Sequence, residues 1–340
     1  MRITTNAILR NYKSNLGTAL SNLDLARNKV MTQRKFTATA QDPSSALRAA
    51  VLERKYARNE DYLNIVDDVQ AFQNSQEDAA MQISTIAKDL SKKYGLEALN
   101  ATNGSQATRD TYADAWRGAQ ESLLLSLNAS YEGKYVFSGS DGHNSPFKLT
   151  NNPDGTQTLT YRGVDVNQGT DQNPNAALDS LSKDTLFVDL GFGLDFESNG
   201  DVDPSSAFNT SLPGINVIGY GLDDDGDPKN MVLLAGLIAD ELEKPDFDYD
   251  RYEQLLNKFE AGRDNVLEKV TTLGTQTEFL TTTKERLETN KINLSTQVDN
   301  VVNADMAEAI MDFSWAQYAY NAALKVGNNI LTPSFIDFMS

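Results

Sequence analysis

The chain has 340 residues, with 30 lysines and arginines against 48 aspartates and glutamates, and its formal net charge is −18 at pH 7. Such an acidic chain repels a phosphate backbone, which excludes a general nucleic-acid role, and no apolar run reaches the roughly 18 residues of a membrane span, so we expect no membrane insertion. The absence of cysteine excludes disulfides, thiolate metal sites and cysteine nucleophiles.

Proline and glycine divide the chain into helical flanks and a turn-rich middle. Seven of the nine prolines fall within residues 146–245, and 13 of the 21 glycines fall within residues 133–226. Residues 44–145 and 246–332 contain no proline, which permits long helices on both flanks. The predicted fold class is therefore mainly α with an inserted β-rich domain.

The first segment, MRITTNAILRNYKSN, lacks the apolar core and cleavage site of a secretory signal peptide, so we expect any export to use another machine. Its apolar residues recur at steps of three and four, as in a coiled-coil seam. This N-terminal seam consists of Ile8, Tyr12, Leu16, Ala19, Leu23, Ala26 and Val30. Membrane-surface binding is an alternative for this basic helix, but Ala19 and Ala26 make its apolar face thin, which favours a protein partner.

A second helix is predicted after the first one ends near the ATAQDPSS segment. Asp42 and Pro43 have the residue types of an N-cap and a first helical position. This helix should run to about Tyr94, and only Gln76 interrupts the apolar character of its seam. The seam positions are Tyr62, Ile65, Val69, Phe72, Gln76, Ala79, Ile83, Ile86 and Leu90.

A third helix is predicted from Gly104 to about Tyr131, with Trp116 as its core anchor. From Gly133 the period changes to two, and KYVFSGS, TQTLTYRGVDV and TLFVDLGFGLDF have the β-branched and aromatic content of strands. The segment NNPDGT between the first two is a turn signal. Residues 133–227 hold 15 acidic and four basic side chains, so we interpret them as an outward, solvated module.

The end of the chain repeats the spacing of its start. The C-terminal seam consists of Val298, Val302, Met306, Ala309, Phe313, Ala316, Tyr320 and Ala323. Residues 1–35 carry seven basic side chains against Asp24, whereas residues 299–340 carry five acidic side chains against Lys325. The opposite charges favour pairing of the two ends; the alternative is that each seam packs onto the nearest helical core.

Residue patterns of catalytic and metal sites are weak in this sequence. The single histidine, His143, lies in the loop-like SDGHNSP segment, and no nucleophile elbow, phosphate-binding loop or zinc spacing occurs. We predict no catalytic residue, no metal site, no cofactor and no enzymatic activity. Two acidic loops come near to calcium loops, but DFESNGDVDPSS has Ser206 where a bidentate Glu is required, and LDDDGDPKN has Gly221 at the first ligand position. We interpret both as solvated turns, with calcium binding as the alternative.

Both ends of the chain resemble flagellar proteins. The opening, MRITTNAILRNYKSNLGTALSNLDLARNKVMTQRKFTATAQDPSSALRA, and the close, MAEAIMDFSWAQYAYNAALKVGNNILTPSFIDFMS, are similar to the terminal segments of the flagellin superfamily. Within it, Asp42-Pro43, GKYVFSGSDGHNSPF and the ending PSFIDFM resemble the hook-associated protein 3 (FlgL) family of hook–filament junction proteins. The sequence departs from that family in the turn MTQRKFTATAQDP and at Ser340.

The resemblance implies a flagellin-like architecture of long helices. Residues 1–44 with 296–340 would form a terminal coiled-coil domain, residues 45–132 with 228–295 a helical rod domain, and residues 133–227 an outer β-rich domain. A single two-helix pair buries too little apolar surface to offset its ordering entropy, about 1–2 kcal/mol per residue. Neighbouring subunits are therefore expected to complete the terminal core.

The resemblance also implies a structural protein that joins hook to filament by assembling into a junction ring through its terminal helices. Its expected partners are further copies of itself, the neighbouring hook-associated protein on the hook side, flagellin on the filament side, and a cytoplasmic export chaperone that contacts Phe335, Ile336 and Phe338. Its expected location is the extracellular flagellum, reached by type III export without a cleaved signal peptide. The alternatives are a flagellin that forms the filament itself and, from another class, an acidic calcium-dependent adhesin.

Overall fold

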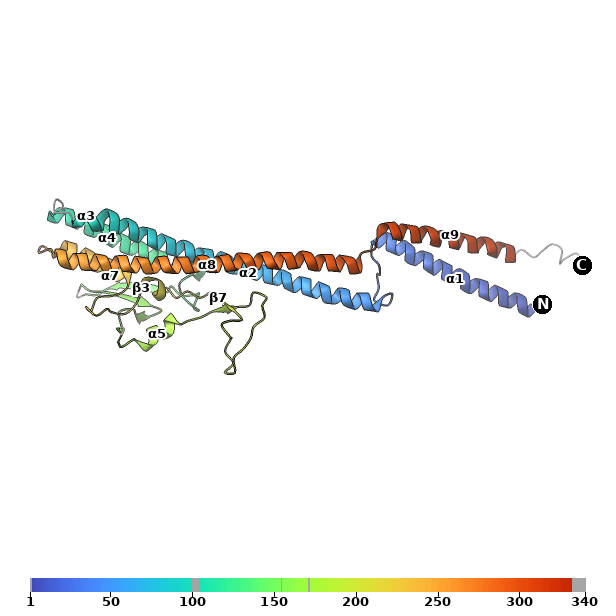
Figure 1. Cartoon of the computed structure of the whole chain (residues 1–340), viewed down its shortest axis with the longest axis horizontal. Coiled ribbons are helices and arrows are strands. Elements are labelled where there is room, and N and C mark those ends of the chain that lie inside the picture. Colours follow the sequence, from blue (N-terminus) through green and yellow to red (C-terminus); the bar gives the residue numbers. More distant parts are fainter. Residues whose placement is uncertain (1, 100–103, 154, 171, 332–340) are drawn as a thin grey trace, which may run out of the picture. The chain divides into compact units, whose positions relative to one another are not determined.

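The computed structural model describes residues 2–99, 104–153, 155–170 and 172–331 (Figure 1). The described chain is mainly helical, with three small antiparallel sheets in its middle, which confirms the predicted mainly α fold with inserted strands. The helices are α1 (Arg2–Thr32), α2 (Pro43–Leu90), the π-helical turn η1 (Ser91–Gly95), α3 (Leu96–Ala98), α4 (Gln106–Leu127), α5 (Ala176–Ser182), α6 (Ile215–Ile218), α7 (Met231–Glu243), α8 (Tyr249–Val302) and α9 (Met306–Leu331).

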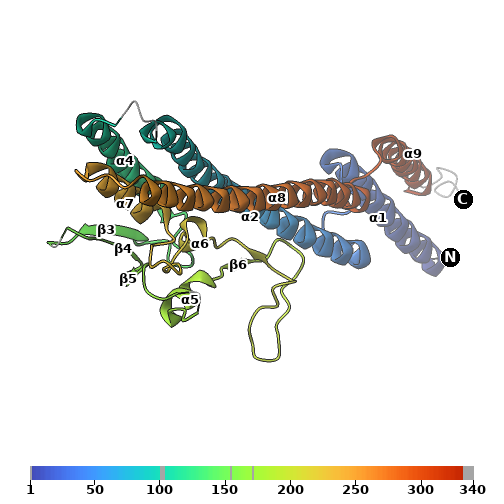
Figure 2. The same ribbon diagram turned by 60° about the vertical axis from the view of Figure 1, so that its left-hand side comes forward.

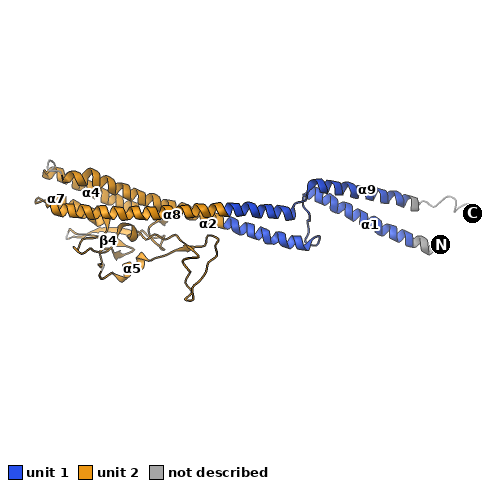
Figure 3. Ribbon diagram, in the orientation of Figure 1, with its two compact units in different colours: residues 1–61, 287–340 blue, residues 62–286 orange. Residues whose placement is uncertain are grey.

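The chain divides into two compact units, which are coloured separately in Figure 3. Unit 1 comprises residues 1–61 and 287–340, and unit 2 comprises residues 62–286. Unit 1 therefore joins the two ends of the sequence, whereas unit 2 contains the whole middle. The finer division into terminal, rod and outer domains stays a prediction.

The start of α2 follows the predicted capping pattern. Oδ1 of Asp42 accepts a hydrogen bond of 3.0 Å from the backbone amide of Ser45, and hydrogen bonds from the side chain and the backbone of Ser45 hold the pKa of Asp42 below its ordinary value. Pro43 suits the first helical position because that residue needs no backbone donor. The helix ends at Leu90, and η1 continues the helical path past Tyr94, close to the predicted end.

The helices α2 and α8 are antiparallel, because contacts that advance along α2 recede along α8. Within unit 2, Lys284 pairs with Asp67 at 2.7 Å, whereas further along α2 the side-chain amide of Gln73 donates to Gln276 at 2.6 Å. On α8, one row of buried side chains recurs every seven residues, and each member is 3% exposed or less. They are Tyr252, Phe259, Val266, Leu273, Leu280 and Leu287.

The predicted seam of the second helix is buried or half-buried at all nine positions. A neighbouring stripe, one position further along, is buried as well, at Leu63, Val66, Gln73, Ala80 and Ala87. Both stripes are buried because α2 is covered on two adjacent faces. One is covered by α8, and on the other the Gln76 amide donates to the carbonyl oxygens of Val136 (2.8 Å) and Thr210 (3.3 Å). Gln76 is therefore a satisfied core residue.

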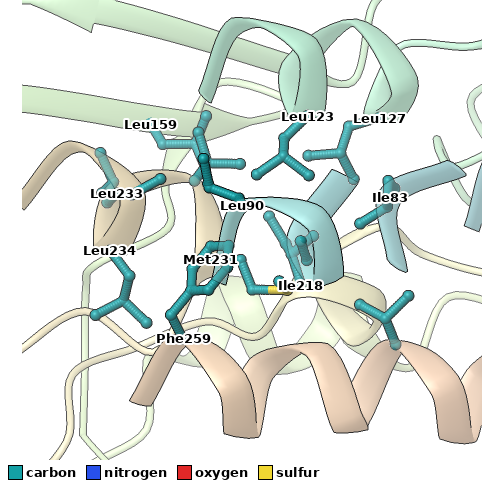
Figure 4. Packing of buried hydrophobic residues seen from close by; sticks show 14 of the residues in the cluster. Ile83, Leu90, Leu123, Leu127, Leu159, Ile218, Met231, Leu233, Leu234 and Phe259 are labelled. Carbon is teal, nitrogen blue, oxygen red and sulfur yellow. The ribbon is translucent and has the colours of Figure 1, made fainter. Parts of the chain in front are cut away.

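The main hydrophobic core lies in unit 2 (Figure 4). Trp116 of α4 is fully buried, as predicted, and meets Phe259 edge-on, with ring centroids 4.9 Å apart and planes at 77°. Figure 4 shows Leu123 and Leu127 of α4 gathered with Leu90 of α2 in the same cluster. Each buried side chain of this size contributes about 1.5–3 kcal/mol, so this cluster is expected to dominate the stability of the unit.

The strands form two pairs and one three-stranded meander in the order β3-β4-β5. Phe147 pairs with Tyr161 at one end of the β3–β4 register, and the NNPDGT turn joins these two strands at the other. The strands are β1 (Ser130–Tyr131), β2 (Lys134–Tyr135), β3 (Phe147–Asn151), β4 (Gln157–Tyr161), β5 (Val164–Asp165), β6 (Phe187–Val188) and β7 (Phe208–Asn209).

Several predicted strand and helix limits were wrong. The third helix ends at Leu127 instead of Tyr131, because the following residues pair as β1 with β2. KYVFSGS pairs only over β2, and the strand before the NNPDGT turn is β3. TLFVDLGFGLDF forms a strand only over β6, apart from an isolated bridge from Phe196 to Val202, because Gly191 (φ 88°) and Gly193 (φ 86°) adopt a left-handed conformation that ends the extended run.

Candidate functional site

The two end helices, α1 and α9, pack side by side in unit 1 (Figure 1 and Figure 2). The two helices are antiparallel. Nζ of Lys29, near the end of α1, lies 3.9 Å from Oδ2 of Asp312, near the start of α9, whereas Tyr12, near the start of α1, lies against Gly327, near the end of α9. The first helix ends at Thr32, a few residues before the predicted ATAQDPSS boundary.

The structure brings the two predicted seams together within one chain. On the N-terminal seam, Ala26 is buried and the residues from Tyr12 to Val30 are at least half-buried. Ile8 differs, because it is 52% exposed. On the C-terminal seam, Val302 and Ala309 are buried, and the remaining six residues are half-buried. Their use as a contact between subunits stays a proposal.

The C-terminal seam crosses a helix boundary. Val298 and Val302 belong to α8, and the other six residues belong to α9. Asp305 caps the start of α9 and so separates it from α8, because its Oδ1 accepts a 2.8 Å hydrogen bond from the backbone amide of Ala307. The backbone amide of Lys35 also donates to the carbonyl of Val302 at 2.8 Å, so the α1–α2 linker is tied to the end of α8.

Packing contributes more than charge to the α1–α9 contact. Among the described side chains, Lys29–Asp312 is the ion pair that joins these helices, and both partners are about half exposed, at 44% and 54%. Pairs of this kind contribute about 0–1 kcal/mol. At Gly327, in contrast, an added Cβ would overlap the phenol oxygen of Tyr12, so the absence of a side chain permits the close approach.

A second apolar stripe runs along the face of α9 opposite its seam. We call it the outer stripe, and it consists of Met311, Trp315, Tyr318, Ala322 and Val326. Trp315 and Tyr318 are each 71% exposed, and their rings meet edge-on at 6.5 Å. A row of exposed apolar residues of this kind is a candidate contact surface. Sequence reasoning missed this stripe, although its steps of four and three residues were visible.

The acidic loop LDDDGDPKN encloses a cation that belongs to the chain itself. Asp223, Asp225 and Asp227 bring their carboxylates together, and Nζ of Lys258 lies 2.7, 2.8 and 2.6 Å from them, respectively. Arg251 forms a second ion pair with Asp227, whose side chain is 7% exposed. The position that a metal ion requires is therefore filled by an ammonium group.

This cluster shifts the pKa values of its members in opposite directions. Hydrogen bonds from Arg251 and, after the opposing effect of burial, from Lys258 hold the pKa of Asp227 below its ordinary value. At Asp223 burial opposes the shift, but the hydrogen bond from Lys258 outweighs it, and the pKa is again lowered. Burial also opposes the shift at Lys258, where bonds to three carboxylates nevertheless raise the pKa.

The remaining predicted positions are not gathered into a site. In the loop that begins at Asp195, Oγ of Ser206 accepts a 3.0 Å hydrogen bond from the amide of Asp195, so the loop closes on itself. His143 is exposed, and its backbone amide donates to Asp141. Phe335, Ile336 and Phe338, the predicted chaperone contacts, lie outside the described residues.

These features define a mainly helical protein whose chain ends pair with each other while its middle forms a separate core with small inserted sheets. None of the helices within the described ranges has both the length and the apolar content of a membrane span. Neither family models nor the sequences of curated proteins give a match to the chain.

The same fold occurs in solved structures of flagellar hook-associated proteins. One from Vibrio parahaemolyticus aligns with a TM-score of 0.60 at 18% identity, covering 77% of this chain and 100% of its own. FlgL from Bacillus cereus aligns with a TM-score of 0.50 at 14% identity, covering 73% of this chain and 99% of its own. Hook-associated protein 3 from Legionella pneumophila aligns with a TM-score of 0.50 at 14% identity, covering 74% of this chain and 98% of its own. At these identities the likeness concerns the fold, and it confirms the resemblance that the sequence indicated.

Proposed function

We propose that this chain is a structural protein of the bacterial flagellum that joins hook to filament, assembling into a junction ring through its terminal helices. The fold shared with FlgL structures supports the flagellar assignment. The outer stripe of α9 is the observation that carries the assembly part of the proposal. One stripe of this helix already faces α1, and a second, aromatic one remains uncovered.

The burial of the terminal helices supports a core that further subunits complete. Among the described side chains, α1 has one buried residue, Ala26, and α9 has two, Ala309 and Gly327. Covering Trp315 and Tyr318 would contribute about 1.5–3 kcal/mol for each ring. Two helices without a third layer therefore gain stability when neighbouring copies pack on them.

In this proposal the ring has three kinds of neighbour: further copies of the chain, another hook-associated protein on the hook side, and flagellin on the filament side. The protein acts outside the cell, after type III export in an unfolded state, and carries no catalytic role. A chain without cysteine suits this route, because no disulfide can form before or during passage.

A deletion strain complemented with single variants tests the proposal. Trp315→Glu places a charge in the outer stripe, and Leu125→Glu is the matched control, because Leu125 is 75% exposed on α4. Wild type and the control should restore filaments, whereas Trp315→Glu should leave bare hooks and flagellin in the medium. Normal filaments with Trp315→Glu, at equal secretion, would contradict the proposal.

The phenotype of the deletion strain also distinguishes a junction protein from the alternative, a flagellin that forms the filament. Loss of a flagellin leaves hooks that still carry their junction proteins, whereas loss of a junction protein leaves flagellin secreted without filaments. The adhesin alternative is disfavoured, because Lys258 neutralises the densest acidic loop. Calorimetry with millimolar Ca²⁺ should give no binding heat.

The C-terminal segment, residues 332–340, is proposed to meet the export chaperone before secretion. Phe335, Ile336 and Phe338 give it an apolar surface after Pro333. Deletion of the segment should abolish recovery of the chaperone in a pull-down, without loss of helical content in the far-ultraviolet spectrum. Chaperone recovery equal to that of the full chain would contradict this assignment.

A further inference from the structure

Unit 2 exposes a cluster of aromatic rings where the loop before β7 meets α8. Phe279 of α8 stacks with Phe192 (ring centroids 6.0 Å apart, planes at 22°) and with Phe208 (5.9 Å, 3°). Phe192 remains 53% exposed, Phe279 45% and Phe196 63%. We call these three stacked rings, together with Phe196 four residues after Phe192 on the same loop, the aromatic patch. A hollow of about 320 Å³ lies beside it and is lined by Phe192, Phe208 and Phe279.

The loop that carries Phe196 has a defined structure. Phe196 forms a β-bridge with Val202, and the amide of Asp203 donates to the carbonyl of Asp195 at 2.9 Å. These contacts close the turn, in which the side chain of Phe196 is exposed to solvent. A single exposed apolar residue is common on protein surfaces, so Phe196 is significant here together with the exposed Phe192 and Phe279.

The loop that carries Phe196 is acidic, whereas Arg286 of α8 lies over the ring of Phe192. No lysine or arginine occurs between Lys183 and Lys229 in the sequence. Asp195 and Glu197 flank Phe196, and both are exposed. Across the described part of the chain, neither carboxylate forms an ion pair. A partner for this surface should therefore present apolar side chains together with positive charge, which disfavours an anionic membrane.

The first turns of α2 present such a surface. Leu47 (66% exposed), Val51 (37%), Arg54 and Arg58 follow one another at steps of four, three and four residues. At 100° per residue, this stripe lies on the side of the helix away from the buried residues Ala49, Leu52 and Asn59. We call Leu47, Val51, Arg54 and Arg58 the basic stripe. Neither arginine forms an ion pair with any described side chain, although Nε of Arg54 donates to the carbonyl of Ala50.

We propose that the aromatic patch of one copy binds the basic stripe of a second copy, an inference that rests on the proposed self-assembly. Leu47 and Val51 would cover the exposed phenylalanine rings. Arg54 and Arg58 would meet Asp195 and Glu197 on either side of Phe196, and a guanidinium also packs well on an aromatic face. Arg286 already does so within the chain, with Cζ 4.0 Å from the ring centroid of Phe192.

Photo-cross-linking of the full-length chain tests the contact. A benzoylphenylalanine replaces Phe196 in isotopically light chain, which is mixed with heavy chain, so that cross-links between copies are identified by mass. Irradiation is carried out on concentrated purified protein and on isolated hooks. We expect cross-links from position 196 to residues 47–58 of another copy.

Charge substitutions make the test specific. Arg54→Glu with Arg58→Glu should lower the yield of this cross-link about tenfold, because two attractive pairs become repulsive. Combination with Asp195→Arg and Glu197→Arg in the other copy should restore it. Lys88→Glu with Lys92→Glu is the matched control, since both are exposed lysines four residues apart on unit 2, and it should leave the yield unchanged.

The outcomes separate this inference from the proposed function. Cross-links from position 196 to a different segment or protein would overturn the inference. A cross-link yield in the Arg54→Glu, Arg58→Glu variant equal to that of the unsubstituted chain would overturn it as well. If the inference fails but the protein is still found on isolated hooks, the proposed junction function stands. If the chain is absent from hooks, the junction function fails, whereas the purified protein still decides whether the two surfaces bind.

Discussion

The helices α7 and α9 are both rich in apolar residues, but their surroundings differ. Ten of the 13 residues of α7 are buried, whereas on α9 only Ala309 and Gly327 are buried among the side chains that the structure describes. Trp315 and Tyr318 of α9 are each 71% exposed. The difference indicates that the middle of the chain completes its own core, while the paired ends leave large apolar side chains exposed.

The largest expected effect on stability comes from a substitution in the core of unit 2. Trp116→Ala removes a fully buried ring that meets Phe259, and should cost about 3–5 kcal/mol in the free energy of unfolding. Trp315→Ala is the matched change on the open helix and should cost less than about 0.5 kcal/mol in the isolated chain. Urea denaturation followed by circular dichroism measures both. Similar losses for the two variants would contradict the comparison.

A smaller effect is expected from the ion cluster that ties the acidic loop to α8. Lys258→Met leaves Asp223 and Asp227 close together without their shared cation, and should destabilise unit 2 by about 2 kcal/mol. Lys88→Met, an exposed lysine with no ion partner among the described residues, should change stability by less than about 0.5 kcal/mol. Equal denaturation midpoints for the two variants would show that the cluster contributes nothing.

The same cluster predicts how stability depends on pH. The pKa values of Asp223 and Asp227 are lowered in the folded state, so their stabilisation is complete above the unfolded value of about 3.9 and is lost as pH falls through the folded values. The raised pKa of Lys258 makes its contribution complete below about pH 10 and lost at higher pH. Denaturation from pH 2 to pH 11 should show a plateau between these limits, and Lys258→Met should flatten the alkaline decline.

The contact between the terminal helices should respond to one added methyl group. Gly327→Ala pushes Tyr12 away and should weaken the α1–α9 pairing by about 1 kcal/mol. Gly17→Ala is the control, because an added Cβ meets nothing within 4 Å there. Hydrogen exchange of residues 12–30 measures the pairing, and it should become faster in the first variant only. Unchanged exchange in Gly327→Ala would show that α1 does not depend on this close approach.

The smallest effect concerns a polar layer between α2 and α8. Gln73 donates to Gln276, but its own Oε1 is buried without a hydrogen-bond partner. Replacing both residues by leucine should raise stability by up to about 1 kcal/mol while loosening the register that the amide pair fixes. Thermal denaturation measures the stability, and disulfide trapping between added cysteines measures the register. A loss of stability above 1 kcal/mol would show that the layer is a net stabiliser.

Local signals in the sequence were sufficient for part of this fold. Asp42 and Pro43 marked the start of α2 through capping chemistry, and Trp116 marked the core, because both depend on residue type. The heptad from Tyr252 to Leu287 was equally visible and was overlooked. The predicted seam of α2 is buried or half-buried, but the sequence did not show that a neighbouring stripe is buried too, because two faces of the helix are covered by segments distant in sequence.

Other features required the tertiary structure. Lys258 reaches Asp223 across 35 positions of the sequence, so spacing alone could not pair them. For α9, spacing shows two apolar stripes, and only packing decides that the one with Phe313 faces α1 and the one with Trp315 stays open. The strand limits near Gly191 depended on backbone conformation.

The central claim is that the outer stripe of α9 is covered when the protein assembles, and Trp315 reports on it directly. The chain has two tryptophans, so Trp116→Phe leaves Trp315 as the sole indole. In the dissolved chain its emission should be that of a solvated indole and acrylamide should quench it strongly. On incorporation into hook–filament junctions the emission should shift to the blue and the quenching should fall. Unchanged emission and quenching in assembled junctions would contradict the claim.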